Sequence, residues 1–272
     1  MIAPTLPVSA TENPIERLLA TVSASRLGTF HQCRLKFYFR YVLQIKKAKT
    51  PALHVGSSVH SVLQEWNMRR WQKFNFYLAG LREYFEKQWA ESQVEEKVAW
   101  DKDDSEEESK LSAWDLLETY FNSTPIPPDE RPEAVEVRVD ADLANHGLPV
   151  LVGVIDLVRE GGKIVDFKTA GQTPNAEKAG HLHELQVNCY SLLYRESTGK
   201  RESGVELHHL VKLKNPKLVV TALPPMTDNQ ETRLLRIIES YVAGVQREDW
   251  VPSPSIMSCA CCEFFNECRR FY

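Results

Sequence analysis

Two aspartates and a lysine lie close together near the middle of the chain, on either side of a Gly161–Gly162 pair. Asp156 lies within an apolar run over residues 150–158, and Asp166 and Lys168 follow the glycines, in and just after a second apolar run. Short β-branched runs around a glycine pair predict a β-hairpin. The three charged side chains are therefore expected on two neighbouring strands.

The register of this hairpin decides whether the charges meet. A three-residue loop sets Arg159 opposite Lys163, which sets Asp156 opposite Asp166. Lys168 shares a face with Asp166, because strand side chains repeat every two residues. Between apolar flanks, each charged side chain costs roughly several kcal/mol unless it is paired or binds a metal. The pattern therefore predicts a divalent-metal site with a cationic helper, and the apolar flanks disfavour the alternative of a solvated hairpin face carrying a surface salt bridge.

The composition is that of a globular protein, with 43% hydrophobic and 26% charged residues in 272. No apolar run is long enough to span a membrane, and the N-terminus does not resemble a secretory signal, so we expect a cytoplasmic location and no membrane partner. The net charge of −4 means that nucleic-acid binding would need a local basic patch. Six cysteines in such a chain indicate metal ligation or free thiols rather than a disulfide framework. No Walker loop is present.

A basic and aromatic segment near the N-terminus is the candidate patch. After a flexible lead-in over residues 1–22, a helix is expected over residues 26–43. Arg34, Lys36 and Arg40 alternate there with Phe and Tyr side chains, a mixture that suits phosphates and bases of a nucleic-acid strand. An amphipathic core helix with a solvated basic edge explains the composition equally well.

The remaining pattern predicts an α/β fold. A helix opens at Gly56 and continues through Trp71, and a helical insertion is expected over about residues 73–123, with the acidic run 101–109 as a loop. Period-two alternation around residues 135–139 predicts a strand with Glu136 on its solvated side. Beyond the hairpin, the predicted elements are helix 182–194, strands 204–213 and 218–222, and helix 228–247. This order predicts a small mixed sheet flanked by helices.

Four short motifs in this order carry a family resemblance. Asp156 followed by Asp166-Phe167-Lys168 resembles the signature of PD-(D/E)xK nucleases, whose core is restriction-endonuclease-like. Gly56 to His60 resembles the Gly-x-x-x-His motif of the RecB-type branch, and Gly153 to Asp156 resembles its Gly-x-x-Asp motif. Gln186 to Tyr190 resembles its Gln-x-x-x-Tyr motif. The resemblance implies a single nuclease domain over residues 23–272.

The cysteines resemble those of an iron–sulfur branch of this family, which includes the AddB nuclease domain and the CRISPR-associated RecB-like exonucleases. In that branch four such cysteines, here Cys33, Cys259, Cys262 and Cys268, hold a [4Fe–4S] cluster. The cluster would staple the N- and C-terminal regions together. Zinc accepts the same donors, so the donor count alone leaves both metals open. Cys261 could replace a neighbouring ligand, and Cys189 is expected to be a buried thiol.

The resemblance implies metal-assisted hydrolysis of a phosphodiester. Asp156, Asp166, His60 and the Phe167 carbonyl would hold Mg²⁺ or Mn²⁺, and Lys168 would act on the attacking water or the phosphate. Gln186 and Tyr190 would orient Lys168 or the substrate, and Glu136 would support the metal ligands.

The expected activity is that of a DNA exonuclease acting on single strands or ends, in repair, recombination, phage or CRISPR-related processing, alone or with other DNA-processing proteins. The alternatives are a noncatalytic iron–sulfur module that binds DNA and a zinc-stapled structural domain.

Overall fold

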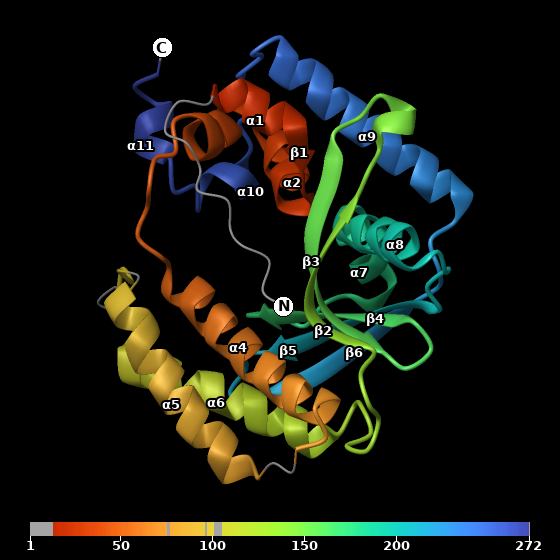
Figure 1. Ribbon diagram of the computed structural model, residues 1–272. Helices are drawn as coiled ribbons and strands as arrows, with labels where there is room; N and C mark the ends of the chain where they lie inside the picture. Colours follow the sequence, from red (N-terminus) through yellow and green to blue (C-terminus); the bar gives the residue numbers. More distant parts are fainter. Residues whose placement is uncertain (1–12, 75–76, 96, 101–104, 272) are drawn as a thin grey trace. The chain divides into compact units, whose positions relative to one another are not determined.

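The computed structural model describes residues 13–74, 77–95, 97–100 and 105–271 and has an α/β architecture (Figure 1). Within these residues the strands form one mixed sheet in the order β1-β3-β4-β5-β6, with β2 also paired to β3. The strands are β1 (Thr21–Val22), β2 (Ala134–Ala141), β3 (Val150–Arg159), β4 (Lys163–Ala170), β5 (Gly204–Val211) and β6 (Lys217–Leu223). The α-helices are α1 (Pro14–Ala20), α2 (Ala24–Gln32), α3 (Arg34–Phe37), α4 (Pro51–Trp71), α5 (Leu78–Glu95), α6 (Glu106–Ser123), α7 (Ala176–Leu182), α8 (Glu184–Thr198), α9 (Asp228–Gln246), α10 (Ile256–Cys259) and α11 (Phe265–Cys268). A π-helix, η1 (Tyr38–Val42), and a 3₁₀ turn, η2 (Ala144–His146), complete the described elements.

The chain divides into two compact units. The sheet unit comprises residues 47–141 and 153–232, and the terminal unit comprises residues 1–46, 142–152 and 233–272. The sheet unit contains every residue predicted for the nuclease site, and the terminal unit contains the four predicted cluster cysteines. None of the described helices has the length and apolar content that crossing a membrane requires.

The central hairpin of the sheet unit has the predicted register. Arg159 pairs with Lys163 across a turn in which Gly161 and Gly162 have φ values of 80° and 73°, a region that glycine enters without steric cost. Strand β4 then runs parallel to β5, and β5 is antiparallel to β6. Because β4 is buried over Ile164–Phe167, it is a central strand, as its apolar sequence predicted.

Helices cover both faces of the sheet in this unit, with α4, α5 and α6 on one side and α7 and α8 on the other (Figure 1). The core on the first side joins the apolar stripe of α4 to β3 and β4 through Leu157, Val165 and Phe167. Helix α4 begins earlier than predicted, at Pro51 rather than Gly56, because Thr50 Oγ1 accepts a hydrogen bond from the Leu53 N–H and caps it.

The terminal unit corrects two sequence expectations. Residues 13–22 of the predicted flexible lead-in form α1 and β1, where Asn13 caps α1 and Leu18 is buried, while residues 1–12 lie outside the described part. The single helix predicted over residues 26–43 is broken at Cys33, whose backbone is extended at φ −163° and ψ 112°. The Leu35 N–H instead donates to the Val251 carbonyl, so a contact distant in sequence replaces part of the helix.

The region predicted as a helical insertion contains α5 and α6. Residues 101–104 of the predicted acidic loop lie outside the described residues. Glu106–Ser109 are not a loop but the first turn of α6, capped by Ser105. Acidic side chains favour the first turn of a helix, where the backbone N–H groups concentrate positive charge. The insertion itself, and the single nuclease domain over residues 23–272, stay predictions.

Two glycines of the terminal unit make a matched test of helix packing. A Cβ at Gly244 in α9 would lie 2.4 Å from Phe30 Cζ, whereas one at Gly28 in α2 would have nothing within 4 Å. We expect Gly244→Ala to lower the free energy of unfolding by about 1–3 kcal/mol through overpacking. Gly28→Ala should raise it by up to about 1 kcal/mol, because alanine is the better helix former. Urea unfolding measures both, and equal effects of the two substitutions would contradict this packing.

Candidate active site

Lys168 is held between two side chains from different elements. Its Nζ lies 2.9 Å from Asp166 Oδ1 and 2.7 Å from Asp166 Oδ2, and it donates a 2.8 Å hydrogen bond to Gln186 Oε1. Gln186 Nε2 in turn donates to the Tyr190 hydroxyl at 2.8 Å, along one face of α8. The structure thus brings four of the predicted residues into one hydrogen-bonded chain.

Asp156 and His60 join this group from β3 and α4. The Phe167 N–H donates to Asp156 Oδ2 at 3.0 Å, and His60 Nδ1 lies 3.6 Å from the same oxygen. Helix α4 can approach β4 because Gly56 has no side chain; a Cβ there would already lie 3.0 Å from Thr169 Oγ1. The glycine of the predicted Gly-x-x-x-His motif therefore positions the histidine. The proposed ligand role of the Phe167 carbonyl stays a prediction.

The site concentrates negative charge that burial disfavours. Asp166 is 2% exposed, and its pKa is raised by burial and by Asp156, although Lys168 opposes the shift. Burial also raises the pKa of Tyr190. Glu136 has a φ of 47°, rare for a residue with a side chain, and partial desolvation together with Asp156 raises its pKa to about 7. The Glu136 carboxylate thus interacts electrostatically with Asp156, and its supporting role stays a prediction.

The donor set suits a hard divalent cation. Asp156 lies beside Asp166 and 3.6 Å from His60 Nδ1, and the pKa of Asp166 is raised chiefly by burial, a cost that a bound cation would offset. Among the described residues, however, no three His, Cys, Asp or Glu side chains are already arranged as a metal site. The residues fit the ion in chemistry and proximity, and their role as ligands is a proposal.

Two histidines beside Lys168 were not anticipated. His209 pairs with Lys168 across β4 and β5, and its Nε2 lies 3.4 Å from Nε2 of His183, the residue that precedes α8. Burial and the Lys168 charge lower the pKa of both rings, which keeps them neutral at pH 7. The available signals in the sequence were a histidine three residues before Gln186 and another within an apolar strand.

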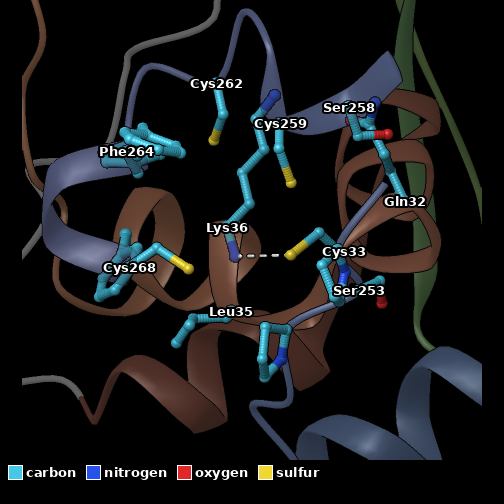
Figure 2. Close-up of a pocket in the computed structure, with 14 residues that line it drawn as sticks. Gln32, Cys33, Leu35, Lys36, Ser253, Ser258, Cys259, Cys262, Phe264 and Cys268 are labelled. Atoms are coloured by element: carbon cyan, nitrogen blue, oxygen red, sulfur yellow. Dashed lines mark hydrogen bonds between the residues drawn. The ribbon is translucent and has the colours of Figure 1, made fainter. Parts of the chain in front are cut away.

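In the terminal unit, the four predicted cysteines line one cavity. Figure 2 shows Cys33, Cys259, Cys262 and Cys268 around it, with the Lys36 N–H bonded to Cys33 Sγ at 3.5 Å. The pKa of Cys268 is raised by burial and by the other three thiols, so the four groups interact. Cys261 is exposed, and Cys189 is buried in α8 with its pKa raised to about 12.

The predicted strand-binding cations are already engaged in the terminal unit. Arg34 forms an ion pair with Asp249, and Arg40 forms one with Glu263. Lys36 lines the cysteine cavity (Figure 2). Binding of a nucleic-acid strand by these three residues stays a prediction, and it would require the two arginines to exchange partners.

Comparison with known proteins identifies the family. A family model described as the PD-(D/E)XK nuclease superfamily matches residues 21–269. A crystal structure of a candidate exonuclease from Eubacterium rectale matches with a TM-score of 0.61 and 16% identity, covering 97% of this chain and 94% of that one. The structure of SSO0001 has a TM-score of 0.43 and 12% identity, covering 92% and 89%, which is too distant to support an argument. No curated protein matches in sequence. The family match, the mixed sheet and the Asp156–Asp166–Lys168 arrangement agree: this chain belongs to the PD-(D/E)XK nuclease superfamily.

Proposed function

We propose that this nuclease is a metal-dependent DNA exonuclease of the RecB-like branch, acting on single strands or DNA ends. The observation that carries the catalytic part is the chain from Asp166 through Lys168 and Gln186 to Tyr190. A buried carboxylate beside a second carboxylate destabilises the fold, and an inactive module would gain nothing by retaining both. This favours catalysis over the alternative of a noncatalytic DNA-binding module. The order of the RecB-type motifs and the exonuclease description of the E. rectale protein support the exonuclease assignment.

The proposed site residues divide the work. Asp156, Asp166 and His60 would hold Mg²⁺ or Mn²⁺, ions that PD-(D/E)XK nucleases commonly use. The bound ion would supply a lowered water pKa and positive charge at the phosphate. Lys168, fixed by Asp166 and Gln186, presents its ammonium to the scissile phosphate and stabilises the charge that develops there. Tyr190 restrains the Gln186 amide, so Lys168 keeps its direction when the substrate leaves.

The cysteine cavity is the proposed site of a second metal centre. We propose that Cys33, Cys259, Cys262 and Cys268 hold a [4Fe–4S] cluster that staples the terminal unit. The support is the convergence of four thiols around one cavity, with Cys261 outside it. Zinc is the competing occupant. Participation in repair, recombination, phage or CRISPR-related processing, with or without protein partners, is part of the same proposal and rests on the resemblance alone.

The nuclease assignment predicts a separation of activity from stability. Asp166→Asn should reduce digestion of end-labelled single-stranded DNA by at least about 100-fold in Mg²⁺ or Mn²⁺. In EDTA at pH 8 its Tm should be no lower than that of the wild type, because folding favours the neutral form of Asp166 and the amide is neutral. Any gain in Tm of the variant over the wild type should disappear below about pH 4, where the wild-type Asp166 carboxyl is protonated in both the folded and the unfolded state. Asp140→Asn, at an exposed position of β2, is the control and should digest DNA as the wild type does. Undiminished digestion by Asp166→Asn would refute the assignment of the site.

Lys168→Ala provides an independent test of the proposed mechanism. We expect it to lower kcat by roughly 100-fold or more, since the charge it supplies is needed in the transition state. Lys163→Ala, at the start of the same strand, should leave kcat within about twofold. Steady-state digestion over a range of substrate concentrations measures kcat and KM for both variants. A change in KM alone for Lys168→Ala would assign the lysine to substrate binding rather than to the chemical step.

The cluster assignment predicts a coloured protein. Anaerobic purification should give brown protein with about four irons per chain, the number set by the [4Fe–4S] type. Cys268→Ser should bleach it and lower its Tm, because metal binding is coupled to folding of the segment. Cys261→Ser should keep both colour and Tm. Colourless protein with stoichiometric zinc after anaerobic purification would show that the cavity holds zinc rather than a cluster. The nuclease assignment would be unaffected.

A further inference from the structure

A cavity of about 190 Å³ lies in the sheet unit beyond the catalytic end of β4. Four segments of the unit form its walls: the first turns of α4, the buried side of α6, the end of β4, and the residue that follows β5. Its lining includes Ala52, Val55, Leu116, Thr169, Gly171 and Lys212. None of the residue roles proposed above uses this cavity.

The cavity adjoins the nuclease site through two of the site's own elements. Thr169 directly follows Lys168, so at about 3.3 Å per strand residue Gly171 lies about 10 Å further along the chain path. On α4, Val55 is five residues before His60, about 7.5 Å along the helix axis. The close approach of Gly56 to Thr169 joins these two walls. The Lys168 side chain lies on the α8 face of β4, where it bonds Gln186, whereas the cavity lies on the α4 and α6 face. A strand whose phosphate lies at Lys168 would therefore enter the cavity around the end of β4, at Gly171.

The lining selects for a small, largely apolar group. Val55 and Leu116 are aliphatic but only 4% and 1% exposed, so they present little surface to the cavity. The more exposed Ala52 and Gly171 add small, uncharged surface. The volume is below the roughly 300–1,000 Å³ of pockets that hold drug-sized ligands, which leaves room for one ring system rather than a nucleotide. Every base offers an apolar face, so a cavity of this kind accepts bases with little regard to sequence.

Charge around the cavity is asymmetric. Lys212 is exposed beside it, and its backbone N–H is fixed to the Ala170 carbonyl at 2.7 Å. The opposite wall begins at the acidic first turn of α6, Glu106–Glu108. A phosphate attached to a base in the cavity is thus attracted on the β5 side and repelled on the α6 side. The charge pattern therefore favours a phosphate on the Lys212 side of the cavity.

We propose that this cavity is a subsite for one nucleobase of the substrate strand, with the adjoining backbone phosphate on Lys212. The proposal rests on the proposed DNA exonuclease function. It accounts for a preference for single strands, because a base can enter the cavity only when it is free of its complement.

Abasic scanning tests the subsite directly. End-labelled single-stranded oligonucleotides, each with one abasic residue, are digested by the full-length protein in single-turnover ladders with Mg²⁺ or Mn²⁺. Wild type should pause at one fixed offset from the abasic residue, with cleavage there slowed roughly tenfold. Ala52→Phe, which fills the cavity, should slow cleavage of intact DNA by a similar factor and abolish the extra pause. Leu53→Phe, which adds bulk on the same helical turn outside the cavity, should behave as wild type.

A lysine pair extends the test to the phosphate and covers the case in which Ala52→Phe fails to fold. Lys212→Ala should raise KM about threefold to tenfold with kcat unchanged and flatten the dependence of KM on salt. Lys214→Ala, two residues further on, should change neither. A position-independent abasic ladder in wild type, or a Lys212→Ala variant identical to Lys214→Ala, overturns the subsite while leaving the exonuclease intact. Failure of wild type to digest any DNA overturns both.

Discussion

Burial of opposite charges at the end of the β3–β4 hairpin is the constraint on which the rest of the sheet unit depends. Asp166 lies almost entirely out of water, beside a second carboxylate, and is tolerated because Lys168 contacts it. Lys168 in turn needs Gln186 to satisfy its remaining donor, which fixes the position of α8. The central strand and the helices on both faces of the sheet shield this ion pair from water, which strengthens the attraction between its charges. The pair must also stay accessible to a substrate phosphate.

The sequence predicted this part well because its determinants are local. The Gly161–Gly162 pair sets the hairpin register, the register aligns the carboxylates, and a four-residue spacing places Gln186 and Tyr190 on one face of α8. The family match over residues 21–269 confirms the resemblance to the PD-(D/E)XK nuclease superfamily. Local patterns also predicted the positions of β2, β5, β6 and α9 to within a few residues.

Local caps at Thr50 and Ser105 were overlooked, but other errors arose where distant parts of the chain decide the conformation. The helix break at Cys33 could not be predicted from residues 26–43, because the Val251 carbonyl that bonds the Leu35 N–H is more than two hundred residues away. The His183–His209 contact likewise depends on which strand neighbours β4. Composition suggested free cations at Arg34 and Arg40, yet their partners Asp249 and Glu263 come from the other end of the sequence. Contacts between distant segments leave no periodic pattern in the sequence from which they could be predicted.

The cysteine cavity has a consequence for how the protein is made. Cys33 lies more than two hundred residues before Cys259, Cys262 and Cys268 in the sequence. The cavity can therefore form only after residues 259–268 have been synthesised and have packed beside Cys33. A nascent chain that stalls before residue 259 carries the whole sheet unit without the cavity. Folding of the nuclease site and filling of the cysteine cavity are thus separable events in the life of one chain.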